Sequence, residues 1–173
     1  MEAVGFDGFF EVGLGGDMTA AYEAEEWAEA YKEGKKKVTS CCPAFVNMVR
    51  RHFPELADNI STTISPMAAV SRLIKAKDPE AVTVFIGPCM AKKSEAADKS
   101  IENNADYVLT FGEAIEMLRG KEVELEPAEE TKQEGSVFGK RFGNGGGVTN
   151  AVIECLKEKG ESTDVKVARC SGA

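Results

Sequence analysis

The chain lacks the features that would assign it to several common protein classes. No apolar run approaches the roughly 20 residues that a membrane-spanning helix needs, and no signal-peptide pattern opens the chain. Positive charge is not in excess either, because 21 lysines and arginines face 29 aspartates and glutamates, which gives a net charge of −8. We therefore expect no membrane insertion and no broad binding to nucleic acid or to an anionic membrane surface.

Evenly spaced cysteine pairs, which mark small secreted domains, are also missing. The chain has five cysteines, an odd number, and two of them, Cys41 and Cys42, are adjacent. Neighbouring Cα atoms lie about 3.8 Å apart, which is shorter than the roughly 4.4 Å that ordinary disulfides require. No CxxC pair occurs, although a zinc-binding interaction module needs four closely grouped ligands. These features favour a reducing, cytoplasmic setting with thiols free for metal or redox chemistry.

What the chain does contain is an alternation of strand and helix patterns. Its 173 residues suffice for one substantial core, and its composition, 43 % hydrophobic and 29 % charged, is ordinary for a globular domain. Asp17 is expected to cap the first helix. Strands are predicted at 82–86, 107–111 and 165–168, with a shorter one at 9–12, and helices at 18–32, 43–52, 66–76, 90–98, 112–119 and 148–159. The alternation predicts an α/β fold: a three-layer domain with a mostly parallel sheet and helices on both faces.

The adjacent cysteines lie in residues 39–45 (TSCCPAF), between a short β-prone run and a helical pattern. Pro43 suits the first position of a helix. Both thiols are therefore expected just ahead of a helix N-terminus, where the positive end of the helix dipole favours thiolate. Adjacent side chains in an extended segment point to opposite faces, so Cys41 and Cys42 are expected to have different roles. The alternative is a pair of buried small apolar residues.

Cys89 repeats this arrangement further along the chain. It follows the strand predicted at 82–86 and precedes the helix predicted at 90–98. In parallel sheets the carboxyl ends of the strands meet at one edge, where ligands bind. Cys41, Cys42 and Cys89 are therefore expected to converge, although they lie far apart in the sequence.

Lys92 and Glu95 lie three residues apart on the same predicted helix and share one face of it. This spacing would let Lys92 reach an anionic ligand at the cysteine site while Glu95 orients the ammonium group. The alternative is a pair of solvated surface charges.

The remaining unusual residues have simpler interpretations. The glycine run at 143–147 lacks the order of a phosphate-binding loop, and we expect it to let the backbone approach a bulky group closely. His52, the only histidine, is interpreted as a charge at a helix C-terminus rather than a ligand. Cys155 is expected in the core, and the role of Cys170 stays open.

Taken together, these stretches resemble the catalytic domain of the iron-only (FeFe) hydrogenases. Residues 39–45 (TSCCPAF) are similar to its first signature, and residues 87–95 (GPCMAKKSE) are similar to its second. Further landmarks match at 16–19 with the glutamates that follow, at 53–66 and at 142–148. The resemblance covers nearly the whole chain, most loosely between about residues 120 and 140, and the combination of cysteine motifs is highly specific.

The resemblance implies an iron–sulfur enzyme. In that family a cubane 4Fe-4S cluster is joined through a cysteine to a diiron unit that carries CO, cyanide and a bridging dithiolate. This H-cluster interconverts protons, electrons and hydrogen gas. By position, Cys42 and Cys89 are implied to be cubane ligands, which suits soft thiolates. Cys41 is implied to be the last proton donor to the bridging dithiolate.

The resemblance also assigns the other candidate residues. Lys92, oriented by Glu95, is implied to donate a hydrogen bond to a cyanide, which suits an ammonium group facing an anionic ligand. The implied proton path to the surface consists of Glu23, Glu26 and Ser61. Phe142 and Gly87 are implied to line the wall of the diiron pocket.

Some positions depart from the family pattern. Phe45 stands where many members have tryptophan, Met67 where many have glutamine, and Gly87 where many have a methionine beside the diiron unit. These departures suggest a divergent branch. The third cysteine signature, a CxxxC that supplies the other two cubane ligands and the bridge to the diiron unit, is absent.

We therefore expect residues 1–173 to be one partial hydrogenase catalytic domain, truncated at both ends and without a second domain, from a longer enzyme of an anaerobe. That enzyme would catalyse reversible H2 oxidation and proton reduction with ferredoxin or another electron carrier. The isolated chain would hold no complete H-cluster and would be inactive. The alternative is a non-catalytic relative, a sensory or iron–sulfur assembly protein. Such relatives commonly replace the cysteine before the cubane ligand, so the presence of Cys41 favours the enzyme.

Overall fold

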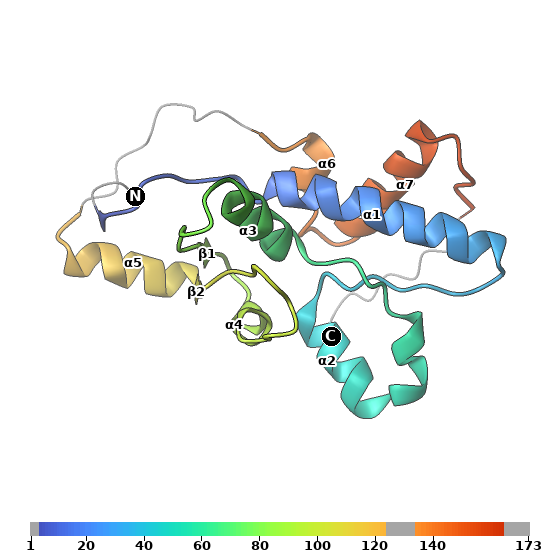
Figure 1. Cartoon of the computed structure of the whole chain (residues 1–173), viewed down its shortest axis with the longest axis horizontal. Coiled ribbons are helices and arrows are strands. Elements are labelled where there is room, and N and C mark those ends of the chain that lie inside the picture. Colours follow the sequence, from blue (N-terminus) through green and yellow to red (C-terminus); the bar gives the residue numbers. More distant parts are fainter. Residues whose placement is uncertain (1–3, 124–133, 165–173) are drawn as a thin grey trace.

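Helices dominate the structure, a computed structural model in which residues 4–123 and 134–164 are described. The elements are α1 (Gly13–Lys32), α2 (Pro43–His52), the 3-10 helix η2 (Pro54–Asn59), α3 (Pro66–Lys77), β1 (Val84–Ile86), α4 (Ala91–Ala96), β2 (Tyr107–Leu109), α5 (Phe111–Gly120), α6 (Val137–Lys140) and α7 (Gly147–Glu158). Figure 1 shows α1 running beside α3, α6 and α7, while β1, β2, α4 and α5 form a second group. The fold is α/β, as the sequence predicts.

The inner face of α1 is made of small residues. Glycine and alanine recur on this face at helical spacing, so the neighbouring backbones approach it closely. A Cβ atom on Gly16, for example, would lie 2.9 Å from the carbonyl oxygen of Gly139 beside it. The buried small residues of the face include Gly15, Gly16, Ala20, Ala24 and Ala28. As a result, α3, α6 and α7 all pack directly against α1.

The start of α1 differs from the sequence prediction. The helix begins at Gly13 rather than at residue 18, and residues 9–12 form no strand. Asp17 lies inside the helix and is not its N-cap; its carboxylate accepts a hydrogen bond from the Ser136 N–H at 2.7 Å instead. Glu11 likewise accepts the N–H groups of Glu134 and Gly135, each at 3.1 Å. These acidic side chains bind the segment just before α6, which is more than 100 residues away in the sequence. No local sequence pattern predicts this contact.

Two helix starts agree with the prediction. α2 begins with Pro43 in its first turn and ends at His52. Its last turn is basic, with Arg50 and Arg51 beside His52, so His52 lies at the C-terminal end of the helix as expected. α3 is capped by Ser65, whose side chain accepts the Ala68 N–H.

The described sheet consists of two short parallel strands. Val84, Phe85 and Ile86 pair with Tyr107, Val108 and Leu109. Both strands are shorter than predicted, because polar side chains bind backbone groups next to their ends. The N–H and hydroxyl of Thr83 bind the Asp106 carboxylate before β1, and Thr110 forms a capping box with Glu113 after β2. The strand predicted at 165–168 lies outside the described residues.

The glycine run ends in a close approach of the chain to itself. Gly146 caps α7 with φ of +79°, a left-handed conformation that favours glycine. A Cβ atom on Gly147 would lie 2.0 Å from the Arg141 carbonyl oxygen, whereas Gly143 and Gly145 have nothing within 4 Å. The close approach expected from the sequence therefore occurs at Gly147, and the group approached is backbone. It places Phe142 against α1 and α7, in a buried cluster with Ala20 and Ala151.

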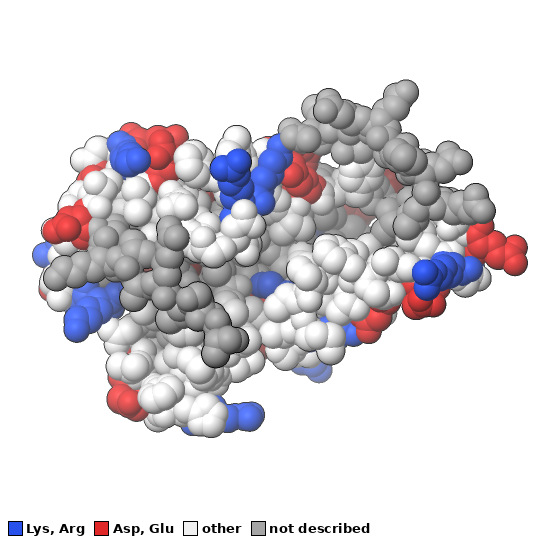
Figure 2. Space-filling model, turned by 180° about the vertical axis from the view of Figure 1, so that it is seen from behind, with Lys and Arg blue, Asp and Glu red and all other residues white. Residues whose placement is uncertain are grey.

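Charges of both signs are interspersed on the face of the molecule that Figure 2 shows. The net charge of −8 is therefore not concentrated in one acidic surface on this face. In the described part of the chain, each helix is too short or too polar to cross a membrane.

We expect the contact between α1 and α3 to tolerate no side chain at residue 15. A Cβ atom there would lie 2.2 Å from the Pro66 carbonyl oxygen and 2.8 Å from a methyl group of Val70. The substitution G15A should therefore lower the free energy of unfolding by about 1–3 kcal/mol, as overpacking does. Urea unfolding measures the change.

The control is G112A in α5, where a new Cβ atom meets nothing within 4 Å. It should leave the stability unchanged or raise it slightly, because alanine favours helix more than glycine does. If G15A and the unsubstituted chain had the same free energy of unfolding, the close contact between α1 and α3 at Gly15 would be contradicted.

Candidate functional site

The adjacent cysteines lie in two different environments at the start of α2. Cys42 is the N-cap residue, with extended φ and ψ of −100° and 104°, and its side chain is exposed. Cys41, one residue earlier, is half-buried. It packs against a buried cluster of three residues, Ala20, Phe142 and Ala151. One thiol is therefore open to solvent and a partner, and the other faces the protein interior.

The interior environment keeps the Cys41 thiol protonated. Burial raises the pKa of Cys41 to about 12, with a further rise from the negative charge of Glu23. Lys92 and the Thr39 hydroxyl oppose this shift but do not overcome it. The sequence-based expectation of a thiolate is therefore wrong for Cys41, because desolvation outweighs the field of the helix N-terminus.

Glu23 lies on the buried side of α1, as does Ala20 of the Cys41 cluster, and its carboxyl group is buried. Only 4 % of its surface is exposed. Its Oε1 accepts the Ser40 N–H at 3.1 Å, and its Oε2 is buried without a hydrogen-bond partner among the described residues. Burial raises the pKa of Glu23 to about 7, the Ser40 N–H lowers it, and the nearby charge of Glu26 raises it. Glu23 can therefore gain and lose a proton near neutral pH, next to a protonated thiol.

Glu26, one turn further along α1, is held as a carboxylate. Its Oε1 accepts Lys37 Nζ at 2.7 Å, and its Oε2 accepts the Ser61 hydroxyl at 2.6 Å. The Thr62 N–H lies between them, at 3.2 and 3.1 Å from the two oxygens. Burial raises the pKa of Glu26, but the hydrogen bonds from Lys37, Ser61 and Thr62 prevail and hold it below its usual value.

Lys92 joins the two cysteine segments. Its Nζ donates to the Glu95 carboxylate at 2.6 Å and to the Cys41 carbonyl oxygen at 3.1 Å. Its backbone N–H donates to the Cys89 carbonyl oxygen at 3.3 Å. The side chains of Lys92 and Glu95 are only 11 % and 8 % exposed, so the alternative of two solvated surface charges is wrong.

Gly87 occupies a confined position at the end of β1. Its N–H donates to the Leu109 carbonyl oxygen at 3.0 Å. A Cβ atom there would lie 2.7 Å from the ring of Phe85, so a larger residue requires that ring to move. Phe142, the other residue assigned to a pocket wall, is buried and lies in the cluster that Cys41 contacts.

A family comparison decides what kind of protein carries this arrangement. The family described as "Iron only hydrogenase large subunit, C-terminal domain" matches residues 1–172. The chain belongs to this family.

Individual relatives agree with this membership in the iron-only hydrogenase family. Iron hydrogenase 1 of Clostridium pasteurianum is 29 % identical over 185 residues, which cover 96 % of this chain and 32 % of that protein. The periplasmic [Fe] hydrogenase large subunit of Nitratidesulfovibrio vulgaris is 27 % identical, covering 98 % of this chain and 46 % of that protein. The chain thus spans about a third to a half of the length of these curated relatives.

A solved hydrogenase structure has the same fold. The apo form of a variant of the [FeFe]-hydrogenase HydA1 from Chlamydomonas reinhardtii aligns with a TM-score of 0.69 and 28 % identity, covering 89 % of this chain and 44 % of that one. The chain is also similar to the cytosolic Fe-S cluster assembly factor NAR1 of Eremothecium gossypii, with 27 % identity over 114 residues, 65 % of this chain and 25 % of that protein.

The free thiols of this hydrogenase-family chain are of the ligand type that iron–sulfur clusters take. Cys42 and Cys89 are free thiols in the segments that precede α2 and α4, and Lys92 joins these segments. A four-iron cluster takes four thiolates. Among the described residues, no group of three or more His, Cys, Asp and Glu side chains is arranged to hold a metal ion. Cys155, predicted in the core, is partly buried and packs against it, and Cys170 lies outside the described residues.

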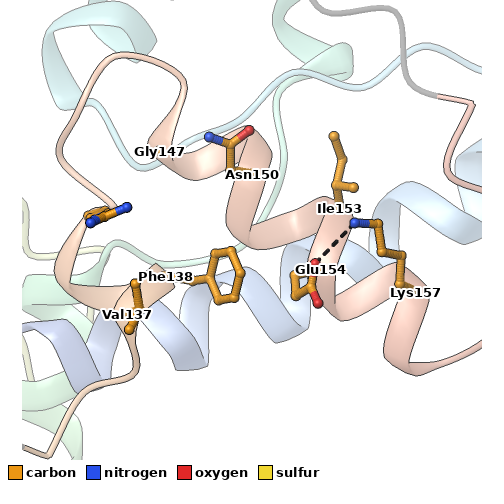
Figure 3. A pocket seen from close by; sticks show the side chains of 8 residues that line it. Val137, Phe138, Gly147, Asn150, Ile153, Glu154 and Lys157 are labelled. Carbon is orange, nitrogen blue, oxygen red and sulfur yellow. Dashed lines mark hydrogen bonds and ion pairs between the residues drawn. The ribbon is translucent and has the colours of Figure 1, made fainter.

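A small cavity that the sequence does not suggest lies on the outer face of α7. Its volume is about 210 Å³, and Figure 3 shows Phe138 of α6 beside it and the ion pair between Glu154 and Lys157. The α7 residues that line it are on the side opposite Ala151 and Leu156, which face α1. The cavity is therefore separate from the Cys41 cluster.

We expect Glu23 to make the stability of the chain depend on pH. Its folded-state pKa of about 7 lies above the ordinary value of 4.5. The stabilisation from the neutral carboxyl is fully present below that ordinary value and is lost as the pH rises through the folded-state pKa. At roughly 1.4 kcal/mol for each unit of pKa shift, the loss is about 3 kcal/mol.

The substitution E23Q should remove this slope, which urea unfolding between pH 4 and 8 measures. The matched control is E29Q, an exposed glutamate on the same helix, which should keep the slope of the unsubstituted chain. A slope that persists in E23Q would assign the pH dependence to another group.

Proposed function

We propose that this chain is part of an iron-only hydrogenase that catalyses reversible H2 oxidation and proton reduction. In this proposal it supplies the proton path and two of the cluster ligands. The observation that carries the proposal is the series of coupled acid–base groups: Glu26 accepts the Ser61 hydroxyl, the charge of Glu26 acts on Glu23, and the charge of Glu23 acts on Cys41. Membership in the hydrogenase family supports it.

Protons would move along this path between groups of unequal proton affinity. Glu26 and the Ser61 hydroxyl receive a proton at the outer end, where the Glu26 side chain is still 20 % exposed. Glu23 holds it next, because its pKa is about 7 and its buried Oε2 has no other partner among the described residues. Cys41 is the last group of the path and packs against the cluster of Ala20, Phe142 and Ala151. Positioned acid–base groups of this kind raise rates by about 10²–10⁴-fold.

The cysteines would then divide their roles. Cys42 and Cys89 would be two of the four ligands of a 4Fe-4S cluster, a role that suits free thiols just ahead of helices. The H-cluster of the complete enzyme supplies the site at which protons and electrons combine. The described residues would supply only two of the thiolates that hold the cluster. The chain's own part in the reaction is therefore proton transfer and the positioning of the cluster.

Lys92 is suited to hold an anionic group beside the cysteines. Two of its three N–H donors bind Glu95 and the Cys41 carbonyl oxygen, and the third has no partner among the described residues. We assign that donor to a cyanide ligand, and Glu95 to the orientation of the ammonium group. Phe142 and the confined position of Gly87 would shape the pocket wall.

A second candidate function is a role in iron–sulfur assembly or sensing without catalysis. The similarity to the assembly factor NAR1 favours it. Cys41 with Glu23 beside it favours the enzyme, because an assembly protein needs the ligand thiol but has no need of an adjacent acid–base group.

Ferredoxin or another electron carrier, together with H2 and protons, would be the partners of the complete enzyme. A cytoplasmic location belongs to the same proposal and is supported by the free thiols of the described residues. The relative from Nitratidesulfovibrio vulgaris is named as periplasmic, so family membership alone does not decide the compartment.

We expect different consequences from removing the two adjacent cysteines in the metal-loaded large subunit that carries this chain. C42A should lower the iron content, because it removes a ligand. C41A should keep the iron content and the CO and cyanide infrared bands while H2 evolution falls by about 10²–10⁴-fold, since a proton-transfer group is lost.

C41D, which can still carry a proton, should recover part of the rate. Iron analysis, infrared spectra and H2 evolution on the three variants distinguish the roles. Loss of iron in C41A with full retention in C42A would reverse the assignment, and full turnover in C41A would refute the role of Cys41 in proton transfer.

The chain by itself is expected to form no complete H-cluster and to evolve no H2, because a four-iron cluster needs four thiolates and no CxxxC occurs among its five cysteines. Infrared spectra of the purified chain after exposure to the maturation proteins test this. CO and cyanide bands in that sample would refute the expectation.

A further inference from the structure

Lys37 occupies a position that none of the roles above uses. It lies in the segment between α1 and α2, and its Nζ is 2.7 Å from Glu26 Oε1 and 3.4 Å from the Ile60 carbonyl oxygen. Both side chains of the ion pair are only 20 % exposed. This burial distinguishes it from surface pairs such as Lys35 with Glu33, whose side chains are 69 % and 59 % exposed.

The residues that bind Glu26 also line a cavity. Lys37, Ser61 and Thr62, which all donate to the Glu26 carboxylate, are among the lining residues of a cavity of about 510 Å³. Further hydroxyl groups, which are able to bind water, line the rest of its wall together with charged and apolar side chains. The hydroxyl-bearing residues of that wall also include Ser40, Thr63, Ser65, Ser94 and Ser100. Glu26 is not among the residues that line the cavity, whereas its three donors are.

We propose that Lys37 is the positioning residue at the entrance of the proton path, holding Glu26 in its ionised, Ser61-bound form and so setting the pH range over which protons enter from the cavity. The inference rests on the proposed function of the path, and it adds a residue and a point of control to it.

The charges around Glu26 explain how this control works. Lys37 on the segment after α1 and Glu23 on α1 itself are the charged groups that face it. Lys37 lowers the pKa of Glu26, whereas the charge on Glu26 helps to raise that of Glu23. The outer carboxyl therefore stays charged at a pH at which the inner one binds a proton. Transfer of a proton from Glu26 to Glu23 is therefore energetically favourable, because Glu23 has the higher pKa.

Without Lys37 this difference should shrink. Glu26 would lose its cationic partner, so its pKa would rise. Once neutral, Glu26 would no longer repel the charge on Glu23, so the pKa of Glu23 would fall. The two titrations would approach each other, and the preference for inward movement would weaken.

The test is a carboxyl titration of the chain itself. The chain is labelled with ¹³C at the glutamate carboxyl carbons, the signals of Glu23 and Glu26 are assigned with E23Q and E26Q, and the titrations are followed by NMR. K37M should raise the midpoint of Glu26 and narrow its separation from that of Glu23, whereas K37R should restore the separation. K37Q, which keeps an N–H donor without the charge, serves the same purpose if K37M does not fold.

The matched control is K75M. Lys75 is also partly buried, at 13 % exposure, and pairs with Asp106 at 2.8 Å, but it does not touch the path. K75M should leave both glutamate midpoints unchanged. An unchanged Glu26 midpoint in both K37M and K37Q would overturn the inference and leave the proposed function standing.

A second measurement separates the inference from the function on which it rests. In the metal-loaded large subunit, K37M should shift the pH profile of H2 evolution while the CO and cyanide infrared bands stay unchanged. If K37M moves the Glu26 titration but not the pH profile, the proton path itself is wrong, and the role of Lys37 in proton entry is wrong with it.

Discussion

The small-residue face of α1 is the constraint on which the rest of the structure depends. Glycine and alanine on this face let the backbones of α3, α6 and α7 approach closely, so the helix is enclosed over much of its length. A glutamate placed on an enclosed face is desolvated. Glu23 is such a residue, and its buried carboxyl group is a direct result of the packing that surrounds it.

Two glutamates three residues apart on one helix thus become chemically different. Glu23 accepts one N–H group and is otherwise buried, so its pKa rises; Glu26 accepts an ammonium, a hydroxyl and an N–H group, so its pKa falls. Sequence spacing alone makes the two residues equivalent. Their environments separate them, which is how proteins commonly assign different acid–base roles to identical side chains.

Features of the fold and site that depend on local pattern could be read from the sequence. These include the helix starts at Pro43 and Pro66, the parallel strands, and the pairing of Lys92 with Glu95. Pro43 and Pro66 are informative because proline in a first helical turn is a local rule. The family resemblance came from two cysteine motifs, and the family model confirms it.

What could not be read depends on contacts between distant segments. Asp17 looks like a helix cap until the N–H of Ser136 is brought beside it. Cys41 looks like a thiolate at a helix start until Phe142 and Ala20 cover it. Nothing in the sequence distinguishes Lys37 from its two lysine neighbours, and only the fold shows that it pairs with Glu26.

The bond from Lys92 to the Cys41 carbonyl oxygen has a consequence for metal uptake. It fastens together two segments that are 51 residues apart in the sequence and that each carry a free cysteine. The folded chain therefore restricts the relative motion of these segments before any iron arrives. The conformational entropy of bringing them together is lost during folding, so under the proposed function a cluster would meet a partly preorganised pair of segments.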